Sequence, residues 1–164
     1  MKQIIYISLF LAASFVQAQE TLSDVLNTYN NKTVPYISVP ELAMPKTNTI
    51  VLDSREQSEF DVSHLKNALF VGYTNFNLEQ VIDIIPNKDS KIVVYCSLGI
   101  RSEDTAEKLL KAGYTNVFNL YGGIFEWKNK GLSVYDKNEK ETENVHVCNS
   151  LWSKWLIKGN KIYD

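Results

Sequence analysis

The chain has 164 residues, of which 45% are hydrophobic and 22% charged, and its formal net charge is −2. This length fits one domain with an appendage, and the mildly acidic balance without a basic stripe argues against a nucleic-acid partner. A chain of this size buries enough surface to fold without staples. Its two cysteines, Cys96 and Cys148, therefore do not indicate a disulfide framework, although an oxidising compartment would permit one bond.

Residues 1–18 are typical of a secretory signal peptide. Lys2 precedes an apolar core over residues 4–16, and small residues lead up to Ala18, after which we expect cleavage. The core is shorter than the about 20 apolar residues that a membrane-spanning helix needs. We therefore expect an exported protein, periplasmic or secreted, with no membrane association after cleavage.

The pattern after the signal peptide alternates short apolar strands with helices. An N-terminal helical segment is expected over residues 19–33, followed by a strand at 36–38 and a helical turn at 40–44. The further expected strands are residues 50–52, 68–71, 92–95 and 117–120, and the further expected helices are residues 56–60, 78–85, 102–112 and 122–127. This alternation predicts one α/β domain with a central, mostly parallel sheet that helices flank on both faces.

The last segment, residues 137–164, is expected to follow that domain, which we place at residues 34–136. Residues 137–144 are charged and contain no apolar side chain, which indicates a solvated linker. The remaining residues include Trp152 and Trp155, too apolar for a free tail, and we expect them to pack back on the domain.

The loop after the 92–95 strand carries the candidate chemistry. Cys96 stands at the carboxyl end of a buried strand, where open α/β sheets bind ligands. Gly99 allows a tight curl, Arg101 adds a positive charge, and Ser102 is expected to cap the next helix. Such a loop aims backbone N–H groups at one point and favours a thiolate. The residues expected to surround the substrate are Ser97, Leu98, Gly99, Ile100, Arg101 and Ser102.

Residues 96–102 read Cys-x-x-Gly-x-Arg-Ser and resemble the active-site loop of the rhodanese-like sulfurtransferases. Residues 51–68 resemble the upstream motif of that family, in which Asp-x-Arg is followed by Glu-Phe and then by His-Ile-x-Gly-Ala. Residues 121–134 resemble its closing motif. The departures lie outside the loop, at Ser63 and Asn67, where the family usually has Gly, and at Ser133, where it usually has Pro.

The resemblance implies a single rhodanese-like domain of the exported bacterial type that transfers sulfane sulfur. Cys96 would take sulfur from a small sulfur-containing anion such as thiosulfate, or from a persulfide donor, and hold it as a persulfide. A thiol or a partner protein would then accept it. Arg101 would steer an anionic donor and offset charge in the transition state. No metal or organic cofactor is implied.

Three further residues are expected to support the loop. Asp53 and Arg55 leave a strand at the same sheet edge as Cys96, and we expect them to hydrogen bond to the loop or to pair with Glu59. His64 is expected to fix a turn by hydrogen bonding. None of the three is expected to react.

Four alternatives stay open from the sequence. Cys96 could be a buried packing thiol, or the domain a binding or regulatory module with weak catalysis. The third alternative is a cysteine phosphatase. Those enzymes place five residues between Cys and Arg, whereas this loop has four, which favours the sulfurtransferase. In a thiol–disulfide protein, Cys148 would resolve Cys96, although no Cys-x-x-Cys is present and an inert packed thiol is the simpler interpretation of Cys148. His146 and Cys148 are too few for a metal site.

Overall fold

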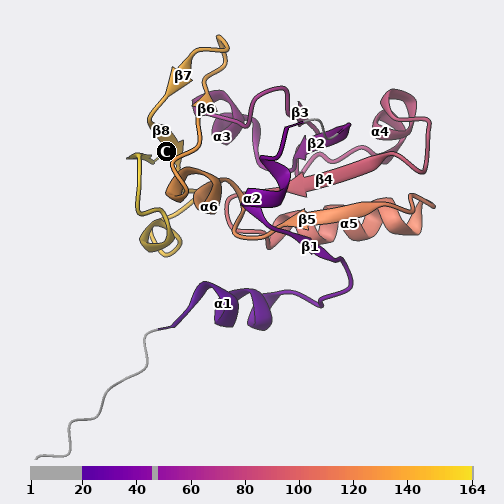
Figure 1. Ribbon diagram of the computed structural model, residues 1–164, viewed down its shortest axis with the longest axis horizontal. Coiled ribbons are helices and arrows are strands. Elements are labelled where there is room, and N and C mark those ends of the chain that lie inside the picture. Colours follow the sequence, from indigo (N-terminus) through magenta and orange to yellow (C-terminus); the bar gives the residue numbers. More distant parts are fainter. Residues whose placement is uncertain (1–19, 46–47, 164) are drawn as a thin grey trace, which may run out of the picture.

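The computed structural model describes residues 20–45 and 48–163 (Figure 1). The predicted signal peptide, residues 1–18, lies outside the described residues. Within the part that is described, no helix combines the length and the apolar character needed to cross a membrane.

Five parallel strands of the described residues form the central sheet, in the order β1-β5-β4-β2-β3. These strands are β1 (Tyr36–Ile37), β2 (Thr49–Asp53), β3 (Leu69–Phe70), β4 (Lys91–Tyr95) and β5 (Val117–Leu120). The helices are α1 (Leu22–Tyr29), α2 (Val39–Leu42), α3 (Gln57–Val62), α4 (Leu78–Ile84), α5 (Arg101–Lys111), α6 (Gly123–Asn129) and the 3-10 turn η1 (Ser153–Trp155). The predicted α/β domain with a parallel sheet is confirmed.

The central strand β4 divides the core into two layers because its side chains alternate between the two faces of the sheet. Ile92 and Val94 pack with α4 and α5 in one cluster, whereas Val93 and Tyr95 pack with α2 and α6 in the other. All of these β4 side chains are fully buried. The helices therefore cover both faces of the sheet. Strand β4 is apolar along its length because both of its faces are buried.

Two smaller sheets follow the central one. Strand β6 (Val134–Tyr135) pairs antiparallel with β7 (Glu141–Thr142), and β8 (Asn144–His146) pairs parallel with β9 (Asn160–Ile162). The expected linker, residues 137–144, thus contains strand β7. The side chains of residues 137–144 are mostly exposed, so β7 forms through backbone pairing with β6. An apolar pattern therefore could not predict this strand.

The C-terminal segment packs against the main domain. Val145, Val147 and Leu156 are buried in the same cluster as Tyr95. The Asn129 side chain at the end of α6 donates a hydrogen bond to the Trp155 carbonyl at 2.9 Å. This segment, drawn in orange to yellow, lies beside α6 (Figure 1).

The helix that follows the cysteine loop begins one residue earlier than expected. Helix α5 begins at Arg101, and its N-cap is Ile100, whose side chain makes no capping bond. Ser102, predicted to be the N-cap, is the second residue of the helix. Its hydroxyl is directed to a buried amide on β5 instead of the helix backbone.

Leu156 tests whether the C-terminal segment is part of the core. Its side chain is 1% exposed, whereas that of the neighbouring Ile157 is 81% exposed. We expect Leu156→Ala to lower the free energy of unfolding by about 2–5 kcal/mol, because it leaves a cavity in the core. The matched change Ile157→Ala is expected to alter it by less than about 0.5 kcal/mol. Urea unfolding of both variants measures this, and equal effects would contradict the packing described.

Candidate active site

Cys96 lies directly after β4, and the following loop curls around its sulfur. The thiol is buried, with the residue 2% exposed. The backbone N–H of Gly99 donates a hydrogen bond to Sγ, with N and Sγ 3.1 Å apart, and the Ser102 hydroxyl approaches Sγ at 3.5 Å. Gly99 has φ 107°, which an L side chain rarely adopts. The loop therefore presents one backbone donor, the Gly99 N–H, to the sulfur.

A buried amide on the neighbouring strand holds the loop in that curl. Asn119 of β5 donates from Nδ2 to the Gly99 carbonyl at 2.8 Å and accepts the Ser102 hydroxyl on Oδ1 at 2.7 Å. The Asn30 side chain, just after α1, donates to the same Gly99 carbonyl at 2.8 Å. With its carbonyl fixed by two amides, Gly99 keeps its N–H turned towards Cys96.

The start of α6 fixes the other end of the loop. The backbone N–H groups of Ile124 and Phe125 donate to the carbonyls of Cys96 and Ser97, at 2.9 and 3.2 Å. This contact needs glycine at position 123, since a Cβ there would overlap the Cys96 carbonyl. The glycine pair that the closing motif contains thus brings a helix N-terminus against the cysteine loop.

An ion pair between Arg101 and Glu59 joins the loop to α3. The two guanidinium nitrogens lie 2.7 Å from the two carboxylate oxygens, and the Ser97 hydroxyl donates to Glu59 at 3.0 Å. Burial opposes ionisation of Glu59, but the hydrogen bonds and charge of Arg101, helped by the charge of Arg55, lower its pKa from 4.5 to about 2. Arg101 is therefore paired with a carboxylate next to the thiol.

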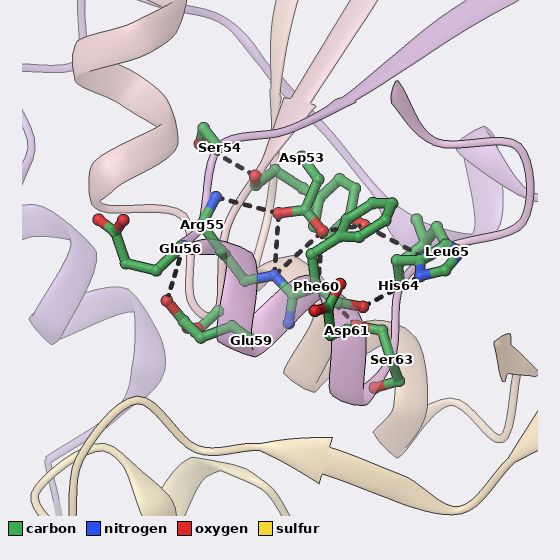
Figure 2. Close-up of polar contacts among 12 residues, drawn as sticks. Asp53, Ser54, Arg55, Glu56, Glu59, Phe60, Asp61, Ser63, His64 and Leu65 are labelled. Carbon is green, nitrogen blue, oxygen red and sulfur yellow. Dashed lines mark hydrogen bonds and ion pairs between the residues drawn. The ribbon is translucent and has the colours of Figure 1, made fainter. Parts of the chain in front are cut away.

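The supporting residues form a separate buried network (Figure 2). The Arg55 guanidinium pairs with Asp53 through Nε at 2.9 Å and also donates to the Ser63 carbonyl at 2.6 Å. The Tyr95 hydroxyl donates to the same carboxylate, and burial first, then the charge of Asp53, raises the pKa of Tyr95. Asp53 and Arg55 were expected to hydrogen bond to the cysteine loop or to pair with Glu59. Instead they pair with each other, and Glu59 pairs with Arg101.

His64 holds the turn between α3 and β3, as expected. Its Nδ1 lies 3.1 Å from the Phe60 carbonyl and its Nε2 lies 3.1 Å from a Glu139 carboxylate oxygen. Its backbone exchanges two hydrogen bonds with Tyr135. These contacts tie α3 to the β6–β7 hairpin, and none of them involves the cysteine loop.

A pocket of about 130 Å³ opens over Cys96, and we call it the Cys96 pocket. The cysteine loop forms its floor, and α1 and the C-terminal segment form its other walls. Its lining residues are Tyr29, Cys96, Ser97, Leu98, Ile100, Arg101, Cys148 and Trp152. The rings of Tyr29 and Trp152 meet edge to face with their centroids 5.5 Å apart, so these two walls touch each other.

Several of the residues that shape this site are not among those predicted from the sequence. Asn119 could have been noticed as a lone amide in an apolar strand, because a buried amide requires partners. Glu59 was considered only as a partner of Arg55. Nothing in the local pattern of Tyr29 or Trp152 pointed to the pocket, since their positions depend on how two distant segments pack.

The chain was compared with known proteins and structures. The family model of the rhodanese-like domain matches residues 41–130, more than half of the chain. A tRNA uridine(34) hydroxylase of Photorhabdus laumondii is 33% identical over 105 residues, which are 61% of this chain but 30% of that protein. The chain thus spans less than a third of that relative's length.

Two solved structures share the fold. A thiosulfate sulfurtransferase from Pseudomonas aeruginosa superposes with a TM-score of 0.58 at 20% identity, over 63% of this chain and 20% of that one. A rhodanese-related protein from Thermoplasma volcanium gives a TM-score of 0.53 at 28% identity, over 61% of this chain and 96% of that one. With the cysteine loop, the sheet order and the family match in agreement, the chain belongs to the family of rhodanese-like domains.

Proposed function

We propose that the protein is a sulfurtransferase that carries sulfane sulfur as a persulfide on Cys96. The observation that supports this most directly is the hydrogen bond from the Gly99 N–H to the cysteine sulfur. Donors preorganised around a sulfur stabilise the thiolate before reaction and the terminal sulfur anion after it, without reorganisation at the moment of reaction. Membership of the rhodanese-like family supports the same chemistry.

The reaction proceeds in two displacements. The Cys96 thiolate attacks the outer sulfur of a donor; a new S–S bond forms, the donor's own bond to that sulfur breaks, and the donor leaves as a thiolate or as sulfite. An acceptor thiolate then attacks the outer sulfur of the persulfide, and Cys96 leaves as the thiolate again. Each step passes one neutral sulfur atom between anions, so no external oxidant or reductant enters.

The charges around the pocket favour a persulfide over thiosulfate as donor. Arg101 is already paired with Glu59 through two short hydrogen bonds, so little of its charge is left for a dianion. The remaining walls include Leu98, Ile100 and Trp152, which are apolar or aromatic. A persulfide carries at most one charge on its sulfur and suits such a pocket better.

The acceptor and the location of the protein rest on the sequence. The chemistry requires a nucleophile that attacks sulfur, and a thiol, free or on a partner protein, is the acceptor we propose. The signal-peptide pattern before Ala18 supports export to a periplasm or the outside of the cell. The name of the Photorhabdus relative refers to a tRNA substrate, but this chain spans 30% of that protein and has no basic stripe, which argues against tRNA as its substrate.

A phosphatase is less well supported by the same loop. Only four residues separate Cys96 from Arg101, and the guanidinium that would bind a phosphate is held by Glu59. A module without catalysis would need neither the buried thiol nor the Gly99 N–H aimed at it.

Sulfur loading of Cys96 tests the proposal. We expect the chain from Gln19 onwards to gain the mass of one sulfur atom from cysteine persulfide, and less readily from thiosulfate, in intact mass spectrometry. Cys96→Ser should gain none, and cyanide should discharge the wild-type protein. If neither donor loads the wild type, the protein is not a sulfurtransferase, and a binding role becomes the better account.

The Glu59–Arg101 pair predicts a specific dependence of stability on pH. The folded-state pKa of Glu59 is about 2 against 4.5 for the free side chain. Its ionised form therefore adds to the free energy of unfolding above about pH 4.5, and this contribution is lost as the pH falls towards 2. The full contribution is on the order of 3 kcal/mol. In urea unfolding, the stability difference between wild type and Glu59→Gln should shrink as the solution is acidified over this range. A difference that stays constant would contradict the low pKa.

A further inference from the structure

A second thiol faces the Cys96 pocket. Cys148 lies 52 positions after Cys96 in sequence, yet both line the same pocket of about 130 Å³. Cys96 is almost completely buried, whereas Cys148 is half-buried and stands nearer to solvent. Both are thiols in this structure. The fold thus places a second sulfur nucleophile across a small space from the first.

The turn after β8 holds Cys148 at that place. Val147 before it is fully buried in the core, and the Cys148 backbone N–H donates to His146 Nδ1 at 3.1 Å. Cys148 has φ 64°, in the left-handed region that a residue with a side chain rarely adopts. Trp152, which touches Tyr29 of α1, closes the same wall. The position of Cys148 therefore follows from packing on both sides of the turn.

We propose that Cys148 is the first acceptor of the sulfur that Cys96 carries, so that sulfur leaves the buried site through a second persulfide on Cys148. This inference rests on the proposed sulfurtransferase function. The Cys148 sulfur attacks the outer sulfur of the Cys96 persulfide; the new S–S bond forms on Cys148, the bond to Cys96 breaks, and Cys96 leaves as the thiolate. A proton from the Cys148 thiol passes to Cys96 or to solvent. The step has no net oxidation and needs no other reagent.

The geometry of the loop favours attack at the outer sulfur. The inner sulfur, Sγ of Cys96, accepts a hydrogen bond from the Gly99 N–H and lies 3.5 Å from the Ser102 hydroxyl. The outer sulfur has to extend into the pocket, towards the wall that contains Cys148. The Gly99 N–H also stabilises Cys96 as the leaving thiolate, which favours outward transfer. Attack at the inner sulfur would instead give a Cys96–Cys148 disulfide and release hydrosulfide.

Peptide mapping of the loaded protein distinguishes these outcomes. The chain from Gln19 onwards is treated with one equivalent of cysteine persulfide, freed of donor, alkylated after increasing times and digested with trypsin. The two cysteines then fall on separate peptides, residues 92–101 and 141–154. In wild type we expect the extra sulfur on the Cys96 peptide first and on the Cys148 peptide later.

Variants show whether the second sulfur depends on the first. Cys148→Ser should hold the sulfur on Cys96 and discharge it to an external thiol on the order of tenfold more slowly, because an intramolecular acceptor is lost. Cys96→Ser should load neither cysteine. Leu151→Ala, a change at a 75% exposed residue of the same segment, should behave as wild type.

Each other result overturns a defined part of the account. Sulfur confined to Cys96 in wild type, with unchanged discharge in Cys148→Ser, overturns the relay and leaves the proposed function standing. A Cys96–Cys148 disulfide with released sulfide also overturns the relay. Loading of Cys148 in Cys96→Ser overturns the relay as well, because Cys148 would then take sulfur directly from the donor. No sulfur on either cysteine of the wild type overturns the proposed function itself.

Discussion

The ion pair between Glu59 and Arg101 is the interaction on which the site most depends. It joins helix α3 to the first residue of α5 across the cysteine loop, and the Ser97 hydroxyl completes it. The pair is largely shielded from water, so its removal would leave one buried charge without a partner, which is costly. It also decides the chemistry of the pocket, because an arginine bound to a carboxylate cannot act as a free anion site.

The rest of the molecule brings four segments to one edge of the sheet. Strand β4 delivers Cys96, β5 delivers Asn119, α6 points its N-terminus at the loop carbonyls, and the C-terminal segment supplies Trp152 and Cys148. The first three arrive there because parallel strands end at a common edge. The last arrives because its buried residues join the same core cluster as β4. The proposed sulfur transfer at Cys96 depends on the first three segments, and the proposed relay to Cys148 depends on the C-terminal segment.

The sequence predicted the sheet, its helices and the cysteine loop, because apolar periodicity and glycine spacing are local signals. It did not predict that Glu59 pairs with Arg101, since partner choice between buried charges is settled by three-dimensional packing. Ser102 was assigned to a helix cap, but the buried amide of Asn119 competes for its hydroxyl. Strand β7 was missed because an exposed, charged hairpin has no apolar alternation to detect.

The most direct test of the central claim is a crystal structure of the chain with one sulfur loaded on Cys96. The account predicts that the outer sulfur lies in the Cys96 pocket, between the loop amides and Cys148, and that Arg101 keeps both hydrogen bonds to Glu59. An Arg101 side chain that leaves Glu59 to pair with the persulfide would contradict it. So would an outer sulfur that points away from the pocket.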